Sequence, residues 1–130
     1  MKGQASLLVV EDNETNMMIF RDILTAAGHR VLEAVTADEA LVIARNDRPD
    51  LILMDIQLPG LDGIEAVRRL KRDPATQSIP IVALTAHAMS AHKEKAMEAG
   101  CSGYITKPIR ARAFREEIEV LLAGGGADHG

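Results

Sequence analysis

The chain has 130 residues, enough for one domain with its own apolar core. Its net charge of -4 argues against a nucleic-acid-binding module, and no apolar stretch approaches the ~20 residues that a membrane helix needs. The single cysteine, Cys101, excludes an intramolecular disulfide. We therefore expect a soluble cytoplasmic protein whose partners include neither nucleic acid nor a membrane.

Five short, mostly apolar runs predict β-strands along the chain. In order, they occupy 6–10, 30–35, 51–54, 79–84 and 102–106. The third run is wholly apolar and lies between Pro49 and Gly60, which is typical of a strand buried on both faces. The second run mixes polar with apolar residues, as an edge strand does.

A segment with helical spacing follows each predicted strand. Apolar residues that indicate these helices fall within 17–27, 40–44, 64–70, 88–99 and 114–122. Two N-terminal capping pairs support the second and third helices, Thr36 with Glu39 and Asp62 with Glu65. Gly28 follows the first helix, where a left-handed residue is needed. Five such units predict an α/β fold: a five-stranded parallel sheet in the order 2-1-3-4-5 with helices on both faces.

Polar residues stand where the predicted strands end, at one edge of such a sheet. They are Glu11 and Asp12 after the first strand, Asp55 after the third, Thr85 after the fourth and Lys107 after the fifth. Because the first and third strands are neighbours in the predicted order, three carboxylates would share a small volume and repel one another. A hard cation such as Mg²⁺ would relieve this repulsion. Acids, Mg²⁺ and a lysine together suit phosphoryl chemistry, in which a carboxylate can be the nucleophile.

Other chemistries fit the sequence less well. No glycine-rich phosphate loop follows a predicted strand. His87 and His92 are five residues apart, a spacing that does not align on one helix face, so a zinc site is not expected. Cys101 lacks a partner histidine and is expected to be an inert buried thiol. The site residues also have structural interpretations: Glu11, Asp12 and Thr85 as helix caps, Asp55 as a turn former, and Tyr104 as a plain strand residue.

Four motifs resemble the response-regulator receiver domains of two-component signalling, which include single-domain CheY-like proteins. They occupy 10–13, 53–63, 83–86 and 104–108, and the resemblance runs from Leu7 to Leu122. It implies that Asp55 accepts a phosphoryl group from a histidine of a partner kinase or phosphotransfer protein. It also implies that Mg²⁺ is held by Glu11, Asp12, Asp55 and the main-chain carbonyl of Gln57.

The same resemblance implies a switch around the phosphoryl group. Lys107 and Thr85 would contact it, Tyr104 would turn inward as Thr85 moves, and the bond between Lys107 and Pro108 would be cis. Gln57 and His87 stand at positions that vary in the family and influence the phosphoryl lifetime. The face of the fourth helix, fifth strand and fifth helix would bind a downstream protein. A group of basic residues either forms a partner surface there or is simply solvated: Lys93, Lys95, Arg110, Arg112 and Arg115.

The sequence therefore predicts a single-domain response regulator that accepts a phosphoryl group and is not an enzyme. Residues 1–123 would form the receiver domain, and 124–130 a flexible C-terminal tail. One alternative is a receiver cut from a hybrid histidine kinase or a longer regulator, with the glycines at 124–126 as a linker. A haloacid-dehalogenase-like phosphatase would need a second Asp where Gln57 stands. A passive binding module would not need the full set of acids, threonine and lysine.

Overall fold

The computed structural model describes residues 5–56, 63–85, 90–106 and 109–123. Its five strands are β1 (Ser6–Val10), β2 (Arg30–Ala34), β3 (Leu51–Asp55), β4 (Ile81–Thr85) and β5 (Gly103–Thr106). All neighbouring strands are parallel, and the order across the sheet is β2-β1-β3-β4-β5. The helices are α1 (Glu14–Ala26), α2 (Ala37–Asp47), α3 (Gly63–Arg72), α4 (Ser90–Ala99) and α5 (Ala111–Leu122). The predicted fold class and strand order are confirmed.

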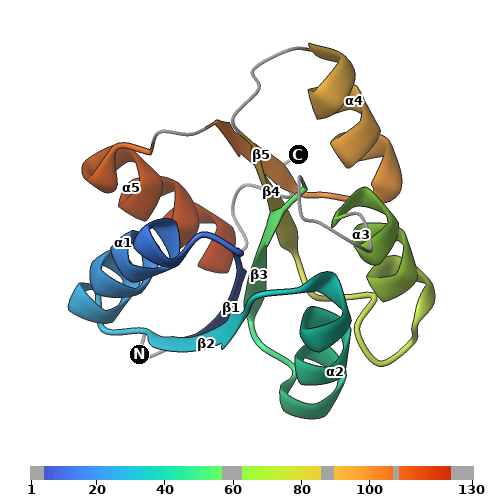
Figure 1. Cartoon of the computed structure of the whole chain (residues 1–130), viewed down its shortest axis with the longest axis horizontal. Coiled ribbons are helices and arrows are strands. Elements are labelled where there is room, and N and C mark those ends of the chain that lie inside the picture. Colours follow the sequence, from blue (N-terminus) through green and yellow to red (C-terminus); the bar gives the residue numbers. More distant parts are fainter. Residues whose placement is uncertain (1–4, 57–62, 86–89, 107–108, 124–130) are drawn as a thin grey trace.

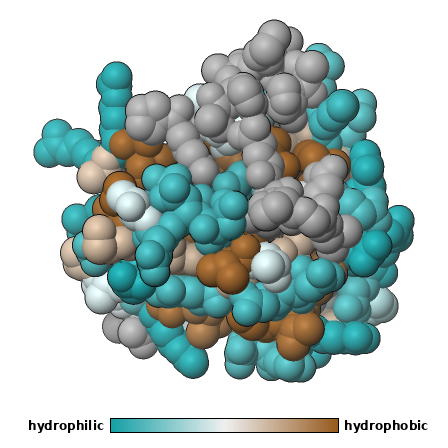
Figure 2. Space-filling model, viewed as in Figure 1, coloured by the Kyte–Doolittle hydropathy of each residue, from teal (hydrophilic) through white to brown (hydrophobic). Residues whose placement is uncertain are grey.

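Two helical layers cover the sheet (Figure 1). Helices α1 and α5 pack on one face through Phe20 and Phe114, whose ring centroids are 5.5 Å apart, and α2, α3 and α4 pack on the other. Strand β3 is buried along its whole length, as expected of a central parallel strand. On the face seen in Figure 2, hydrophobic residues form separate patches among hydrophilic ones. None of the helices in the described ranges has the length and apolar character that a bilayer span requires.

The predicted helix ends depend on specific caps. Asn13 caps α1 by accepting a hydrogen bond from the Asn16 amide (2.9 Å), and Gly28 after this helix has a φ of +92°. Thr36 caps α2 by accepting from the Glu39 amide (3.1 Å). The Glu39 carboxylate in turn accepts from the amide of Val35, one residue earlier than the usual capping box. Of the other predicted pair, Asp62 lies outside the described residues.

The strand ends differ from the sequence prediction by one or two residues. Strands β3 and β4 each extend to include the polar residue that was expected to follow them, Asp55 and Thr85. Strand β4 begins at Ile81 and not at residue 79, because Pro80 has no N–H to donate and joins the ladder only through its carbonyl, which accepts from the Ile52 amide (3.0 Å). These shifts bring the two polar residues into the sheet itself.

Cys101 is buried after α4, as expected for an inert thiol, and burial raises the pKa of this thiol from 9.0 to about 11. Nearby, the Lys71 ammonium donates to the carbonyls of Gln77 (3.1 Å) and Ile79 (2.8 Å), and burial lowers its pKa.

The shifted thiol gives a stability prediction at alkaline pH. Between pH 9 and pH 11 the unfolded thiol ionises while the folded Cys101 keeps its proton, so the stability of the folded state falls as pH rises. We expect this group to remove about 2 kcal/mol of unfolding free energy between pH 8 and 10.5. Lys71 has the opposite effect: its pKa is lower in the folded state than in the unfolded state, so its contribution to stability rises with pH. Urea unfolding of wild type and Cys101→Ala at both pH values measures the difference, and an equal fall in the two proteins would contradict it.

Candidate functional site

The register of the sheet fixes where the acidic residues lie. Strands β1 and β3 pair up to Val10 and Met54, so Glu11 and Asp55 are the next residues on neighbouring strands. The ladder continues past both strand ends. The Glu11 amide donates to the Ala34 carbonyl (3.0 Å), and the Ile56 amide donates to the Leu84 carbonyl (3.1 Å). Backbone hydrogen bonds therefore hold both acids at the carboxyl edge of the sheet.

The carboxylates of Glu11, Asp12 and Asp55 form one cluster, with an oxygen of each within 4.8 Å of the others. Glu11 and Asp55 are buried, with exposed fractions of 1% and 4%, whereas Asp12 is exposed. Two buried negative charges at this distance repel by about 3 kcal/mol at an effective dielectric constant near 20. The predicted gathering of three acids is confirmed, and it is an arrangement that a cation would stabilise.

The donor set fits a hard divalent cation. All three groups offer carboxylate oxygens, which Mg²⁺ prefers, and Asp12 leaves one side of the cluster open to water. Glu11 is also held in place by a second contact, because its Oε2 accepts a hydrogen bond from the Asn13 amide (3.2 Å) at the start of α1. The fourth expected ligand, Gln57, lies outside the described residues.

Thr85 lies on β4, the strand next to β3, and Tyr104 lies on β5, one strand further along the sheet. Asp55 pairs with Leu84 on β4, so Thr85, which is fully buried, is one residue beyond it at the same edge. Tyr104 on β5 pairs with Ala83, two residues before Thr85, and its half-buried side chain packs against the core under α3 and α4. The two residues therefore share one face of the sheet. Lys107, Pro108 and His87 lie outside the described residues.

Gly63 is a site residue that the sequence reasoning missed. It begins α3, and a Cβ added to it would lie 2.5 Å from the carbonyl oxygen of Asp55 and 2.6 Å from the Cα of Ile56. The start of α3 is thus packed directly onto the backbone that carries Asp55. The glycine belongs to one of the four motifs, but no spacing rule indicates what it faces.

Comparison with known proteins also indicates a response regulator receiver domain. Residues 7–119 match the response regulator receiver domain. The chain is 46% identical over 117 residues to the polar-differentiation response regulator DivK of Brucella anthropi, covering 90% of this chain and 95% of the relative. It is 45% identical to DivK of Brucella ovis over the same shares. The residues at 11–13 and 54–59 predict a likeness to DivK, and this prediction is confirmed.

Solved structures agree. The receiver domain of sensor histidine kinase PA1611 from Pseudomonas aeruginosa PAO1, which has a magnesium ion coordinated in its active site cleft, is 31% identical with a TM-score of 0.86. That similarity covers 93% of this chain and 99% of the other. A CheY-like receiver domain protein from Methanospirillum hungatei JF-1 has a TM-score of 0.88 at 26% identity, covering 98% of this chain and 100% of the other. The chain belongs to the response regulator receiver domain family.

Proposed function

We propose that the chain is a phosphorylation-controlled switch of two-component signalling in which Asp55 accepts the phosphoryl group. The observation that carries this proposal is the Asp55 carboxylate at the end of β3, within 4.8 Å of the Glu11 and Asp12 carboxylates. An Asp55 oxygen would attack the phosphorus of a phosphohistidine on a histidine kinase or phosphotransfer protein. The new phosphorus–oxygen bond forms as the phosphorus–nitrogen bond breaks, and the histidine nitrogen keeps the electron pair.

Glu11, Asp12 and Asp55, with the main-chain carbonyl of Gln57, would hold Mg²⁺. When bound, Mg²⁺ supplies positive charge that neutralises the carboxylates and the phosphoryl oxygens. The burial of Glu11 and Asp55 supports this assignment, because buried like charges need a counter-ion. The exposed side of the cluster at Asp12 is where a donor histidine would approach.

Phosphorylation would be transmitted through the two neighbouring strands. The hydroxyl of Thr85 and the ammonium of Lys107 would contact the phosphoryl oxygens, and Tyr104 would turn inward as Thr85 moves. The shared sheet face of Thr85 and Tyr104 supports this coupling. The result is a shift between two conformations that a downstream protein reads on the face of α4, β5 and α5. In this role the chain is a cytoplasmic phosphoacceptor with protein partners, and it has no separate substrate.

Labelling with a radioactive small-molecule donor tests the proposal. With acetyl phosphate and Mg²⁺ we expect about one phosphoryl group per chain, held as an acyl phosphate that hydroxylamine removes. Removal of divalent ions with EDTA is expected to lower the labelling rate at least about 100-fold, because the acids then repel the incoming phosphoryl oxygens. Sustained turnover of phosphomonoesters would instead indicate a phosphatase. Absence of labelling with every donor would indicate a passive module.

A further inference from the structure

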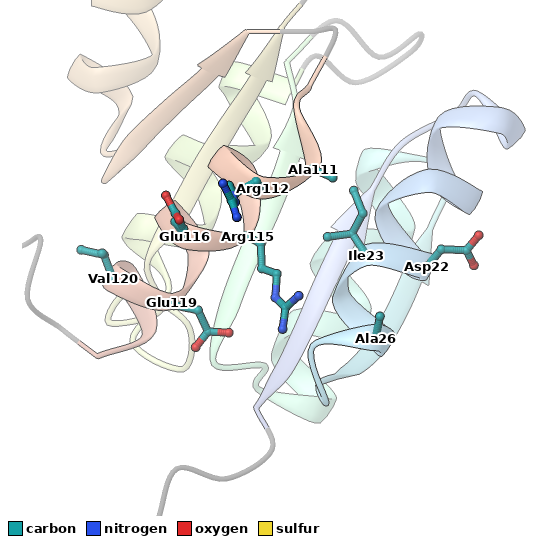
Figure 3. A pocket seen from close by; sticks show the side chains of 9 residues that line it. All are labelled: Asp22, Ile23, Ala26, Ala111, Arg112, Arg115, Glu116, Glu119 and Val120. Carbon is teal, nitrogen blue, oxygen red and sulfur yellow. The ribbon is translucent and has the colours of Figure 1, made fainter.

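An open groove of about 830 Å³ lies between α1 and α5, away from the acidic cluster. Figure 3 shows its walls: Ile23 extends from α1 toward α5, and Arg115 extends from α5 toward α1. Helix α5 supplies six of the lining residues, Ala111, Arg112, Arg115, Glu116, Glu119 and Val120. All six are exposed. They recur at helical spacing and so form one continuous face of α5.

The charges on this face oppose the dipole of their own helix. Helix α5 has no acidic residue in its first turn and no basic residue in its last. Instead Arg112 lies near the positive N-terminal end and Glu119 near the negative C-terminal end. For Arg112, no ion pair in the described parts of the chain offsets this cost, and a local rule broken without such a gain is a mark of a functional surface.

Pairing within the helix does not account for the pattern. Arg112 with Glu116 and Arg115 with Glu119 have the i,i+4 spacing, but in the less favourable order, with the base before the acid. Across the described parts of the chain, Arg112, Arg115 and Glu116 make no ion pair within 4.0 Å. Glu119 is held by His29: the Nδ1 of this ring accepts from the Ala5 amide (3.3 Å), so its Nε2 donates to the Glu119 carboxylate (2.9 Å).

We propose that the groove face of α5 binds the same face of a second copy of this chain, with the two helices antiparallel. The six residues read apolar, basic, basic, acidic, acidic, apolar. When a two-fold axis lies between Arg115 and Glu116, each residue meets its complement on the other copy: Ala111 with Val120, Arg112 with Glu119, and Arg115 with Glu116. Each pair occurs twice, as an isologous interface requires. The antiparallel arrangement also sets the positive end of each helix dipole beside the negative end of the other.

Apolar side chains on this face and next to it supply contact area. Val120 on α5 is 52% exposed, and Met18 and Ile19 on α1 are 46% and 41% exposed. Ile19 stands one helical turn before Ile23 and therefore continues the α1 wall of the groove. A contact made by one short helix and part of another is small, so we expect a dissociation constant on the order of 10–100 µM. Because its ion pairs lie near the surface, added salt weakens the dimer.

Analytical ultracentrifugation of the full chain tests the proposal, over concentrations from about 5 to about 500 µM, a range that brackets the expected constant. Wild type is expected to pass from monomer to dimer. Arg115→Glu creates two acidic pairs at the centre of the interface, and Glu116→Arg creates two basic pairs. Each variant alone is expected to weaken the dimer at least about tenfold.

The decisive experiment mixes the two variants in equal amounts. An equimolar mixture of Arg115→Glu and Glu116→Arg sets an acid against a base at both central pairs, one with reversed charges and one as in wild type. The mixture is therefore expected to dimerise over the same concentration range as wild type. Glu117→Arg is the matched control for Glu116→Arg, because it makes the same acid-to-base change on α5 at an exposed residue outside the groove. It is expected to leave the dimer intact. A wild type that stays monomeric at every concentration overturns the proposal. A dimer that ignores both reversals, or a mixture that stays monomeric, overturns it equally.

Discussion

Asp55→Asn is expected to abolish phosphoryl labelling while making the metal-free protein more stable. The amide of Asn cannot attack phosphorus as a carboxylate does, so labelling by acetyl phosphate should fall at least about 1,000-fold. Asn also has nearly the shape of Asp, which keeps the end of β3 in its place on the sheet. The loss of labelling is therefore a chemical effect and not a loss of fold.

The gain in stability follows from the acidic cluster. Asp55 and Glu11 are both buried, and their oxygens lie within 4.8 Å of each other. Removing one charge relieves a repulsion of about 3 kcal/mol. Asp55 also makes a native interaction that the substitution weakens, so we expect a net gain of about 1–2 kcal/mol in EDTA. In saturating Mg²⁺ we expect wild type to be more stable than Asp55→Asn. The wild-type cluster binds the ion more tightly, and the ion stabilises only the folded state.

Urea unfolding in EDTA and in Mg²⁺ measures both halves of this prediction. Asp47→Asn is the control, since Asp47 is an exposed residue at the end of α2, before the start of β3, whereas the cluster lies at the other end of that strand. It is expected to retain full labelling and to respond to Mg²⁺ as wild type does. If Asp55→Asn proved less stable than wild type in EDTA, the three carboxylates would not be a source of strain in the folded protein.

Much of the site could be predicted from the sequence because its acids terminate apolar runs. The run before Asp55 marks a buried central strand, and the run before Glu11 marks its neighbour, so the strand order alone brings the two acids together. The exact ends of the strands are harder to predict from the sequence. Asp55 and Thr85 belong to their strands because the backbone ladder continues through them, and a polar side chain at the end of an apolar run hides this continuation.

What the sequence could not indicate is how surfaces form between elements distant in the chain. The sequence suggests that the basic residues of α4 and α5 form one face. In the folded chain Arg112 and Arg115 instead line the α1–α5 groove together with Glu116 and Glu119, so that part of the face carries mixed charge. Which side of α5 meets α1 is decided by the packing of both helices on the sheet, through Phe20 and Phe114, and not by α5 alone.

Gly63→Ala is expected to lower the unfolding free energy by about 2–4 kcal/mol. It is also expected to slow phosphoryl transfer to Asp55. An added methyl group would lie 2.5 Å from the Asp55 carbonyl oxygen and 2.6 Å from the Ile56 Cα, both of them backbone atoms that cannot rotate away. Either α3 moves outward or the end of β3 is displaced, and the second movement carries the Asp55 carboxylate out of line with Glu11 and Asp12.

Gly103→Ala is the matched control, because its added methyl group would make only ordinary contacts, 3.6 Å from a Val82 side-chain carbon and farther from others. It is expected to change stability by less than about 1 kcal/mol, since alanine is no worse than glycine in a strand. Urea unfolding gives the two stabilities, and labelling rates at equal folded fraction separate displacement of Asp55 from simple unfolding. A Gly63→Ala protein as stable and as readily labelled as Gly103→Ala would mean that α3 does not press on the backbone of the phosphoacceptor.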